Sequence, residues 1–148
     1  MAVDKNIIDE YLTKWQNILR LKDWDIESRL VDVEWRKSGD IKIDDANKMA
    51  VLMINSNTLM TNLEELVIHE LLHLRVWGLD QMIEGYVNIV FGEDESDPKR
   101  EFAMTTFFKE LEATVEDLTK GYLEANGGEK PSFHRVEKQI AAEIGTCI

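Results

Sequence analysis

The sequence predicts a single domain of the α+β class, in which one helix precedes a small sheet and several helices follow it. Three observations predict this plan. The length of 148 residues suits one domain with a core of its own. Apolar residues recur at helical spacing near the N-terminus and through the second half, and the region between them has the alternation and short apolar runs of strands. No internal repeat or long linker divides the chain, so we expect residues 1–148 to form one domain.

The first part of the chain is predicted to contain one helix and three strands. Apolar positions three and four residues apart indicate an amphipathic helix over residues 4–20. Residues 26–35 alternate loosely between apolar and charged side chains, as expected of a half-buried strand. A Ser-Gly-Asp turn at 38–40 leads to a short strand at 41–43, and the apolar run at 49–54 has the length of another strand.

Two helices are predicted in the middle of the chain. Thr61 stands three residues before Glu64, which is the spacing of a capping box, so a helix is expected to begin there. Its apolar pattern continues as far as Gly78, which is expected to end it. Residues 82–91 have a second helical pattern that Gly92 closes.

A long helix and a short one are predicted after an acidic loop at 93–97. Pro98 suits the first position of a helix that covers residues 97–124, and the Asn-Gly-Gly sequence at 126–128 stops it. Ser132 is expected to cap the last short helix. These two helices complete the predicted order of helices and strands.

The composition excludes several classes of function. The chain has 29 acidic residues against 17 basic ones and a formal net charge of −12, so its average field repels nucleic acid and anionic membranes. It has one cysteine, Cys147, which cannot form an internal disulfide. We find no signal-peptide pattern and no apolar run of roughly 20 residues that a membrane span needs. These observations predict a soluble cytoplasmic protein that binds neither nucleic acid nor membrane.

One motif carries chemical information. His69, Glu70 and His73 form the sequence HExxH within a segment that the apolar pattern already predicts to be a buried helix. Residues four apart lie on one helix face, so both imidazoles can reach one ion, and zinc readily takes neutral imidazole nitrogen. Glu70 lies beside that ion, where a general base could take a proton from metal-bound water. The alternative is two helix histidines with ordinary hydrogen bonds, but three polar residues in a buried helix need partners.

A third ligand must come from elsewhere in the chain. The pattern HExxHxxGxxH is excluded because Val76 stands where the glycine is needed. His134, the only other histidine, is more simply explained as a surface residue after a Pro-Ser turn. Glu112 and Glu116 place two carboxylates on one face of the long predicted helix, one turn apart. One of the two can bind the metal, and the other can accept the free N–H of a ligating imidazole.

The sequence resembles the gluzincin clan of zinc metallopeptidases, and more narrowly the small single-domain minigluzincins and related phage and bacterial metallopeptidases. The similarity covers roughly residues 20–125. Its matching segments are the entry to the sheet, the strand before the motif, the motif helix and the downstream glutamate helix, at residues 21–26, 50–54, 64–74 and 112–116.

The resemblance implies a zincin-like metallopeptidase fold and a zinc-dependent peptidase activity on peptide or protein substrates. It implies one zinc ion held by His69, His73 and Glu112, with Glu70 as the catalytic base. The family's order of the two acids then leaves Glu116 to hold a ligating imidazole in place. Zinc suits this donor set better than magnesium or calcium, which prefer oxygen ligands.

The resemblance also implies how a substrate binds. In such a fold the edge strand beside the cleft, which we expect at residues 49–54, would bind an extended peptide by strand addition. An oxyanion donor is also expected, and the sequence does not choose among its candidates. These candidates are Arg75, Tyr86, Tyr122 and His134.

Other functions were weighed against a peptidase. A zincin scaffold could keep its metal and bind a partner without cutting it, but such a module has no need of Glu70. Structural zinc sites are usually rich in cysteine, and no cysteine lies near the motif. Cys147 could instead block the open coordination position, although a spare terminal thiol is the simpler interpretation.

Overall fold

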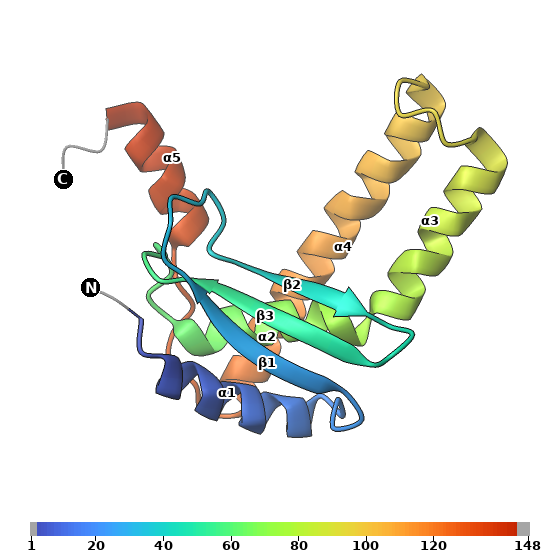
Figure 1. Ribbon diagram of the computed structural model, residues 1–148. Helices are drawn as coiled ribbons and strands as arrows, with labels where there is room; N and C mark the ends of the chain where they lie inside the picture. Colours follow the sequence, from blue (N-terminus) through green and yellow to red (C-terminus); the bar gives the residue numbers. More distant parts are fainter. Residues whose placement is uncertain (1–2, 145–148) are drawn as a thin grey trace.

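The computed structural model describes residues 3–144, which form an α+β domain (Figure 1). Cys147 lies outside the described residues. The described part of the chain has five helices and three strands. In chain order these are α1 (Lys5–Ile18), β1 (Asp25–Val31), β2 (Gly39–Asp44), β3 (Met49–Asn55), α2 (Leu63–Arg75), α3 (Trp77–Phe91), α4 (Pro98–Ala125) and α5 (His134–Ile144).

The sheet has the strand order β1-β3-β2. β1 runs parallel to β3, and β2 runs antiparallel to it, so β3 is the central strand. The prediction that residues 49–54 form the edge strand is therefore wrong. A continuous apolar run is what a strand needs when neighbours cover both its sides, and Leu52 and Ile54 of β3 are fully buried. β2 occupies the edge next to α2.

The first strand is shorter than predicted. It ends at Val31 instead of residue 35, and a loop at residues 32–38 follows it. The side chain of Asn55 holds this loop, because its Nδ2 donates hydrogen bonds to the carbonyl oxygens of Trp35, at 3.0 Å, and Lys37, at 2.9 Å. The alternation of apolar and charged residues continues past the end of the strand, so it predicted a longer element. The alternation does not show that the side chain of Asn55 binds the backbone that follows.

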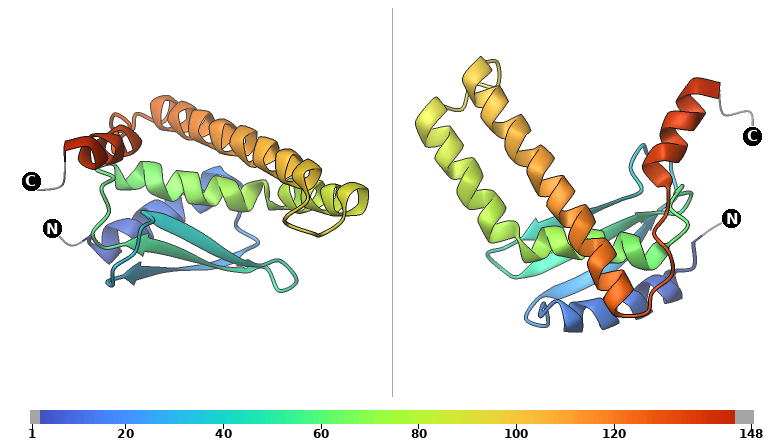
Figure 2. Two further views of the ribbon diagram at one scale, coloured as in Figure 1. Left: turned by 90° about the horizontal axis from the view of Figure 1, so that it is seen from above. Right: turned by 180° about the vertical axis from the view of Figure 1, so that it is seen from behind.

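α2 lies between the sheet and α4 (Figure 2). α1 packs beside α2 and also contacts β1, so the two helices cover the same face of the sheet. The core between these layers includes Trp15 of α1, Leu52 of β3 and Leu71 of α2, all of which are fully buried. Burying apolar area on both sides of α2 fixes this helix as the centre of the domain.

The cap of α2 differs from the predicted capping box. The N-cap residue is Asn62 instead of Thr61, and its side chain accepts a hydrogen bond from the N–H of Glu65 at 3.1 Å. Ser132 does not cap α5, because its Oγ accepts hydrogen bonds from the N–H groups of Thr61, at 3.0 Å, and Asn62, at 2.8 Å. The Ser132 N–H in turn donates to the buried Glu65 carboxylate at 2.8 Å. The helix is therefore capped locally, one residue later than predicted, and the long-range contact with Ser132 binds the two N–H groups that precede the first turn.

α2 and α3 meet at a sharp junction. α2 ends at Arg75, and Val76, with φ −100° and ψ 9°, serves as the cap residue of both helices. Gly78 was expected to end the first helix, but it lies in the first turn of α3. The apolar pattern continues through the junction, so it shows neither where α2 ends nor where α3 begins.

α3 and the first half of α4 form an antiparallel hairpin that projects from the body (Figure 1). Asp97 caps α4 through hydrogen bonds from the N–H groups of Lys99 and Arg100, and Pro98 occupies the first helical position as predicted. The second half of α4 crosses α2. Among residues 3–144, no helix combines the length and the apolar character that crossing a membrane would require.

Candidate metal centre

The two motif histidines lie on one face of α2. His69 and His73 are four residues apart in a regular helix, and their ring centroids are 5.0 Å apart. Both side chains are partly buried, with 14% and 23% of their area exposed. The helix therefore presents two imidazoles side by side at the rim of the core.

Glu112 reaches these histidines from α4. Its Oε1 lies 3.1 Å from Nε2 of His69, and its Oε2 lies 3.2 Å from Nε2 of His73. The two Nε2 atoms thus face the same carboxylate, which comes from the helix that crosses above α2. Two imidazole nitrogens and one carboxylate form the donor set of a three-residue zinc site that keeps one position open.

Glu116 lies one turn further along α4 and meets the opposite side of one ring. Its Oε1 is 3.3 Å from Nδ1 of His69, the nitrogen that does not face Glu112. A carboxylate on the far nitrogen of a metal-binding imidazole fixes its tautomer and its orientation. The ligand atoms of His69, Glu112 and Glu116 all lie within 4.8 Å of one another.

Glu70 is buried beside the histidines, with only 6% of its area exposed. Burial raises the pKa of its carboxyl group, while the charges of His69 and His73 act in the opposite direction. One carboxylate oxygen of Glu70 lies within 4.8 Å of ligand atoms of both histidines. A buried carboxylate with a raised pKa is a stronger base than an exposed one and can take a proton from a neighbouring water.

The histidines and Glu112 influence each other's protonation. Burial acts to lower the pKa of His69, but the hydrogen bond to Glu112 and the charges of Glu70, Glu112 and Glu116 outweigh it, so the pKa is raised. Hydrogen bonds from His69 and His73 hold the pKa of Glu112 far below its usual range. Glu112 is therefore an anion throughout the neutral range, as a metal ligand must be.

Arg135 is a member of the site that the sequence did not reveal. This residue stands in the first turn of α5, and its guanidinium donates to Oε1 of Glu112 at 2.9 Å and to Oε1 of Glu116 at 3.3 Å. A lone arginine in a short amphipathic helix carries no local signal of such a role. Only the folding of α5 back towards α4 brings it to the two glutamates.

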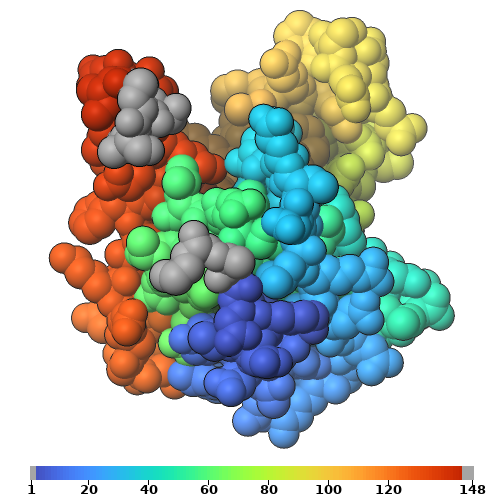
Figure 3. Space-filling view, turned by 60° about the vertical axis from the view of Figure 1, so that its left-hand side comes forward, coloured from blue at the N-terminus to red at the C-terminus, as the bar shows by residue number. Residues whose placement is uncertain are grey.

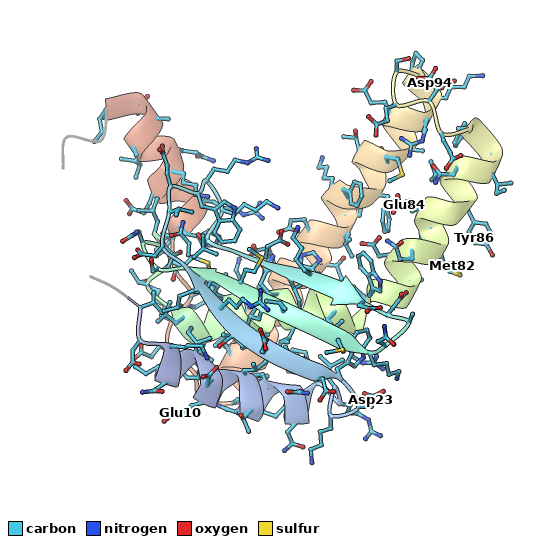
Figure 4. The ribbon with its side chains drawn as sticks, in the orientation of Figure 1. Glu10, Asp23, Met82, Glu84, Tyr86 and Asp94 are labelled. Carbon is cyan, nitrogen blue, oxygen red and sulfur yellow. The ribbon has the colours of Figure 1, made fainter. Side chains whose placement is uncertain are left out.

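Only one of the four candidate oxyanion donors lines the pocket that contains His69 and Glu70. This residue is His134, which is half-buried instead of lying at the surface as expected. Tyr122 packs edge-on against Trp15 at 5.8 Å, and Tyr86 projects from α3 away from α4 (Figure 4). Arg75, in the last turn of α2, is exposed. Burial lowers the pKa of His134, although the charges of Glu116 and Glu65 oppose that shift.

Open pockets lie on both sides of the two histidines. The larger, of about 700 Å³, contains His69 and Glu70, and the smaller, of about 320 Å³, also contains His73. Gly39 at the start of β2 lines both of them. A Cβ atom on Gly39 would lie 3.0 Å from the Leu66 side chain of α2. The absence of a side chain at Gly39 therefore lets the edge strand approach α2 closely.

The first turn of α2 is held in place by two buried glutamates. Glu64 accepts hydrogen bonds from Lys14 and from the indole of Trp15, both at 2.7 Å, and Glu65 accepts one from the backbone of Ser132. Acidic side chains in the first turn also suit the positive end of the helix dipole. These contacts hold α2 against α1 and against the segment that leads into α5.

Comparisons of the chain with protein-family models, with curated proteins and with solved structures found no match. Any function must therefore be argued from the arrangement of the residues themselves.

Proposed function

We propose that the protein is a zinc-dependent peptidase with a zincin-like fold of the gluzincin type. The observation that carries the proposal is the convergence of His69, His73 and Glu112 from two crossing helices, with buried Glu70 beside them. Neither helix alone contains this constellation, and it combines ligands and base in the arrangement that metal-assisted hydrolysis needs.

The donor set fits zinc. Two imidazole nitrogens with one carboxylate favour zinc over magnesium and calcium, and the three residues leave a position for water. Glu116 on Nδ1 of His69 adds the outer hydrogen bond that zinc-binding histidines usually have. His69, His73 and Glu112 would hold the ion.

Each residue of the centre then has a defined task. When bound, zinc supplies Lewis acidity, which makes a water nucleophilic and a carbonyl electrophilic. Glu70 accepts the proton of the attacking water, because burial raises the pKa of its carboxyl group and makes the carboxylate a stronger base. Glu116 keeps the His69 ring in the tautomer that leaves Nε2 free to bind. His134 is the candidate donor to the oxyanion because it lines the same pocket.

An extended peptide would bind along β2. This strand pairs with β3 on one side only, so the backbone groups of its other edge are available for strand addition next to α2. The close approach at Gly39 brings that edge to both pockets. This assignment replaces the strand at residues 49–54, which lies in the middle of the sheet.

Metal analysis combined with peptide digestion tests the proposal. Protein purified without chelator should carry close to one equivalent of zinc and should cleave a random peptide library, and a chelator should stop the cleavage. The matched control is Glu70→Gln, a nearly isosteric change that should keep the zinc and abolish hydrolysis because an amide cannot take the proton.

Three results would contradict this assignment. The first is protein that neither carries a transition metal nor takes one up. The second is zinc-loaded protein that cleaves nothing in the library. The third is equal turnover by Glu70→Gln and the parent, which would remove Glu70 from the mechanism.

A further inference from the structure

Positive charge gathers on one side of the metal centre. The pocket of about 700 Å³ has four cationic side chains in its lining, namely Arg36, Lys37, Arg135 and Lys138. Among residues 3–144, its anionic side chains are the three glutamates of the centre itself, namely Glu70, Glu112 and Glu116. A bound divalent ion would add further positive charge. The whole chain has a net charge of −12, so this cationic wall differs in sign from the rest of the molecule.

The cationic wall is built from two segments that are far apart in the sequence. Arg36 and Lys37 belong to the loop at residues 32–38, which Asn55 holds through two hydrogen bonds. Arg135 and Lys138 belong to α5, whose approach is anchored to α2 through Ser132. Figure 3 shows this loop (cyan) and α5 (red) on the same face of the molecule, beside the α3–α4 hairpin.

Two of the four cations are free to meet a ligand. Lys37 pairs with Asp40 at 3.1 Å, and Arg135 pairs with the glutamates of the centre. Arg36 and Lys138 are exposed and make no ion pair within residues 3–144. An anionic group that enters the pocket can therefore bind these two side chains without displacing an existing partner.

The opposite side of the centre has the opposite charge. The smaller pocket contains Asp40 and Asp80 in addition to Glu70 and Glu112, and its only cation is Lys37, which is already paired with Asp40. The two pockets share His69 and Glu70, so the cleft is cationic on one side of the reacting groups and acidic on the other.

We infer that the substrate is a peptide with a carboxylate group immediately to one side of the bond that is cleaved, and that Arg36 and Lys138 bind this carboxylate. The inference rests on the proposed peptidase function and specifies its substrate class. The carboxylate can belong to an Asp or Glu side chain or to the C-terminus of the peptide. Both present the same two oxygens to a guanidinium or an ammonium group.

A set of internally quenched peptides tests the preference. In an otherwise neutral alanine-rich peptide, each position in turn carries Glu, Gln or Lys, and every peptide is made with a free and with an amidated C-terminus. Zinc-loaded protein should cleave the Glu peptides at least about tenfold faster than the Gln peptides at one position, which corresponds to a single charge-assisted contact. A preference for the free terminus over the amide would identify the C-terminal carboxylate as the source.

Charge reversal supplies the matched controls. The double variant Arg36→Glu and Lys138→Glu should lose the preference for Glu and gain one for Lys. Lys22→Glu makes the same type of change at an exposed site outside the lining and should behave as the parent does. Equal cleavage of the Glu, Gln and Lys peptides by the parent, with both termini, would overturn the inference while leaving the peptidase proposal intact.

A binding measurement tests the carboxylate preference separately from the peptidase proposal. If no peptide is cleaved, the proposed function has failed, and fluorescence anisotropy of labelled Glu and Gln peptides on zinc-loaded Glu70→Gln still tests the pocket. Tighter binding of the Glu peptide, lost in the double charge reversal, supports the inference. Equal binding of the two peptides contradicts it.

A separate observation concerns α3. Its outer side carries an apolar stripe with members three and four residues apart, namely Leu79, Met82, Tyr86 and Ile89, with Val90 adjacent. Ile89 is 86% exposed and Tyr86 is 60% exposed. In Figure 4, Met82 and Tyr86 lie on the side of α3 that faces away from α4, whereas Glu84 lies on the α4 side. This spacing is that of the contact line between two packed helices.

Gly85 gives independent support for close helix packing at this surface. It lies in the middle of α3, where glycine is less favourable than alanine. A Cβ atom at this position would meet nothing within 4 Å, so the single chain offers no packing reason for a glycine. Gly78, one heptad earlier, has the same empty surroundings. A second helix that approaches closely would account for both.

We propose that the α3 stripe is the contact between two copies of this chain in an antiparallel two-fold dimer. Such an interface must be complementary to itself, and the stripe is uncharged. The only charged residues of α3 are Asp80 and Glu84, so two chains with a net charge of −12 can meet here with little repulsion between the touching surfaces. All five residues of the stripe are exposed, by 46% to 86%, so a second copy would remove a continuous apolar surface from water.

Analytical ultracentrifugation of the full chain tests the dimer. The parent should sediment as a dimer, and Ile89→Glu should sediment as a monomer with an unchanged circular dichroism spectrum. Val33→Glu places the same charge at another exposed apolar site, which is 70% exposed and lies in the loop before β2, and it should remain dimeric. A monomeric parent, or a dimer that survives Ile89→Glu, would overturn the proposal.

Discussion

Single residues of the proposed metal centre would differ in role because each meets a different atom. Glu112 faces Nε2 of both histidines, whereas Glu116 faces only Nδ1 of His69. The structure therefore gives two chemically equivalent glutamates different surroundings, and in the proposed metal centre one would hold the metal while the other would orient a ligand.

Substituting each glutamate should separate these tasks. We expect Glu112→Gln to lose most of its zinc affinity, because a neutral amide replaces an anionic ligand. Glu116→Gln should lose about 10–100-fold in affinity or activity while the site still fills, which is the usual effect of removing an outer hydrogen bond. Zinc titration of both variants is the measurement. Metal-free Glu116→Gln together with tight zinc binding by Glu112→Gln would exchange the two roles.

The pKa of His69 predicts the pH dependence of zinc binding. Zinc binds the neutral imidazole ring. Because the pKa of His69 is raised, protons compete with zinc for this ring at pH values above 6.5, the ordinary pKa of histidine. Apparent zinc affinity should therefore fall as the pH drops through the raised pKa, by about tenfold per pH unit for one histidine. Glu112 contributes nothing to this loss because its pKa lies far lower. Competition against a zinc-binding dye at several pH values measures the trend, and a constant affinity would contradict it.

In metal-free protein the same pKa shift makes the stability of the fold depend on pH in the opposite direction. Because the folded state raises the pKa of His69, the pair with Glu112 stabilises the fold fully below the unfolded pKa, and this stability is lost as the pH rises through the folded value. The metal-free and zinc-bound forms should therefore differ in the direction of their pH dependence in this range.

Among the elements, α2 has the most demanding position. It is covered on one side by the sheet and on the other by α4, and it must still present two histidines and a glutamate at its rim. Its N-terminus is held by long-range hydrogen bonds, and Gly39 allows the edge strand to approach it. The precision of the centre thus depends on how α2 is anchored.

The observed cap leads to a prediction at this scale. Asn62→Ala should lower the free energy of unfolding by about 0.5–2 kcal/mol, because it removes the cap to Glu65. The loss should fall at the upper end, since the Asn62 side chain also donates to the carbonyl oxygens of Glu129 and Lys130. The control is Thr61→Ala, which removes one exposed hydrogen bond to Ser132. Urea unfolding of both variants decides between the observed and the predicted cap, and a larger loss in Thr61→Ala would favour the latter.

At the scale of the whole molecule, the centre joins segments that are far apart in the chain. Its residues come from α2, α4 and α5, and β2 forms the adjacent wall of both pockets. The α3–α4 hairpin projects on one side of the molecule and α5 on another (Figure 1). A ligand that connects α2 with α4 would therefore stabilise the domain as a whole.

Zinc should accordingly raise the melting temperature. If folded protein alone binds the ion, free zinc at 1,000 times the Kd adds about 4 kcal/mol to the free energy of unfolding. A chelator should reverse the shift, and Glu112→Gln should show little of it. Calorimetry with and without zinc measures the effect, and an equal shift in the parent and in Glu112→Gln would place the binding elsewhere.

The sequence by itself determined the order of the helices and the face on which the motif lies, but not the junction between α2 and α3. The spacing of four residues between His69 and His73 is a local property, because any regular helix places such residues side by side. The same argument puts Glu112 and Glu116 on one face of α4. The α+β order also followed from local patterns, since apolar periodicity distinguishes a long helix from a short strand.

Only the tertiary structure decided how these elements meet. The apolar run of β3 is compatible with an edge or a central strand, and pairing with β1 and β2 chose the centre. The approach of Arg135 to Glu112, the contact of Ser132 with the start of α2 and the cationic pocket all depend on contacts between distant segments. Side-chain spacing describes a single element, whereas these features are set by burial and hydrogen bonding between elements, which no local pattern contains.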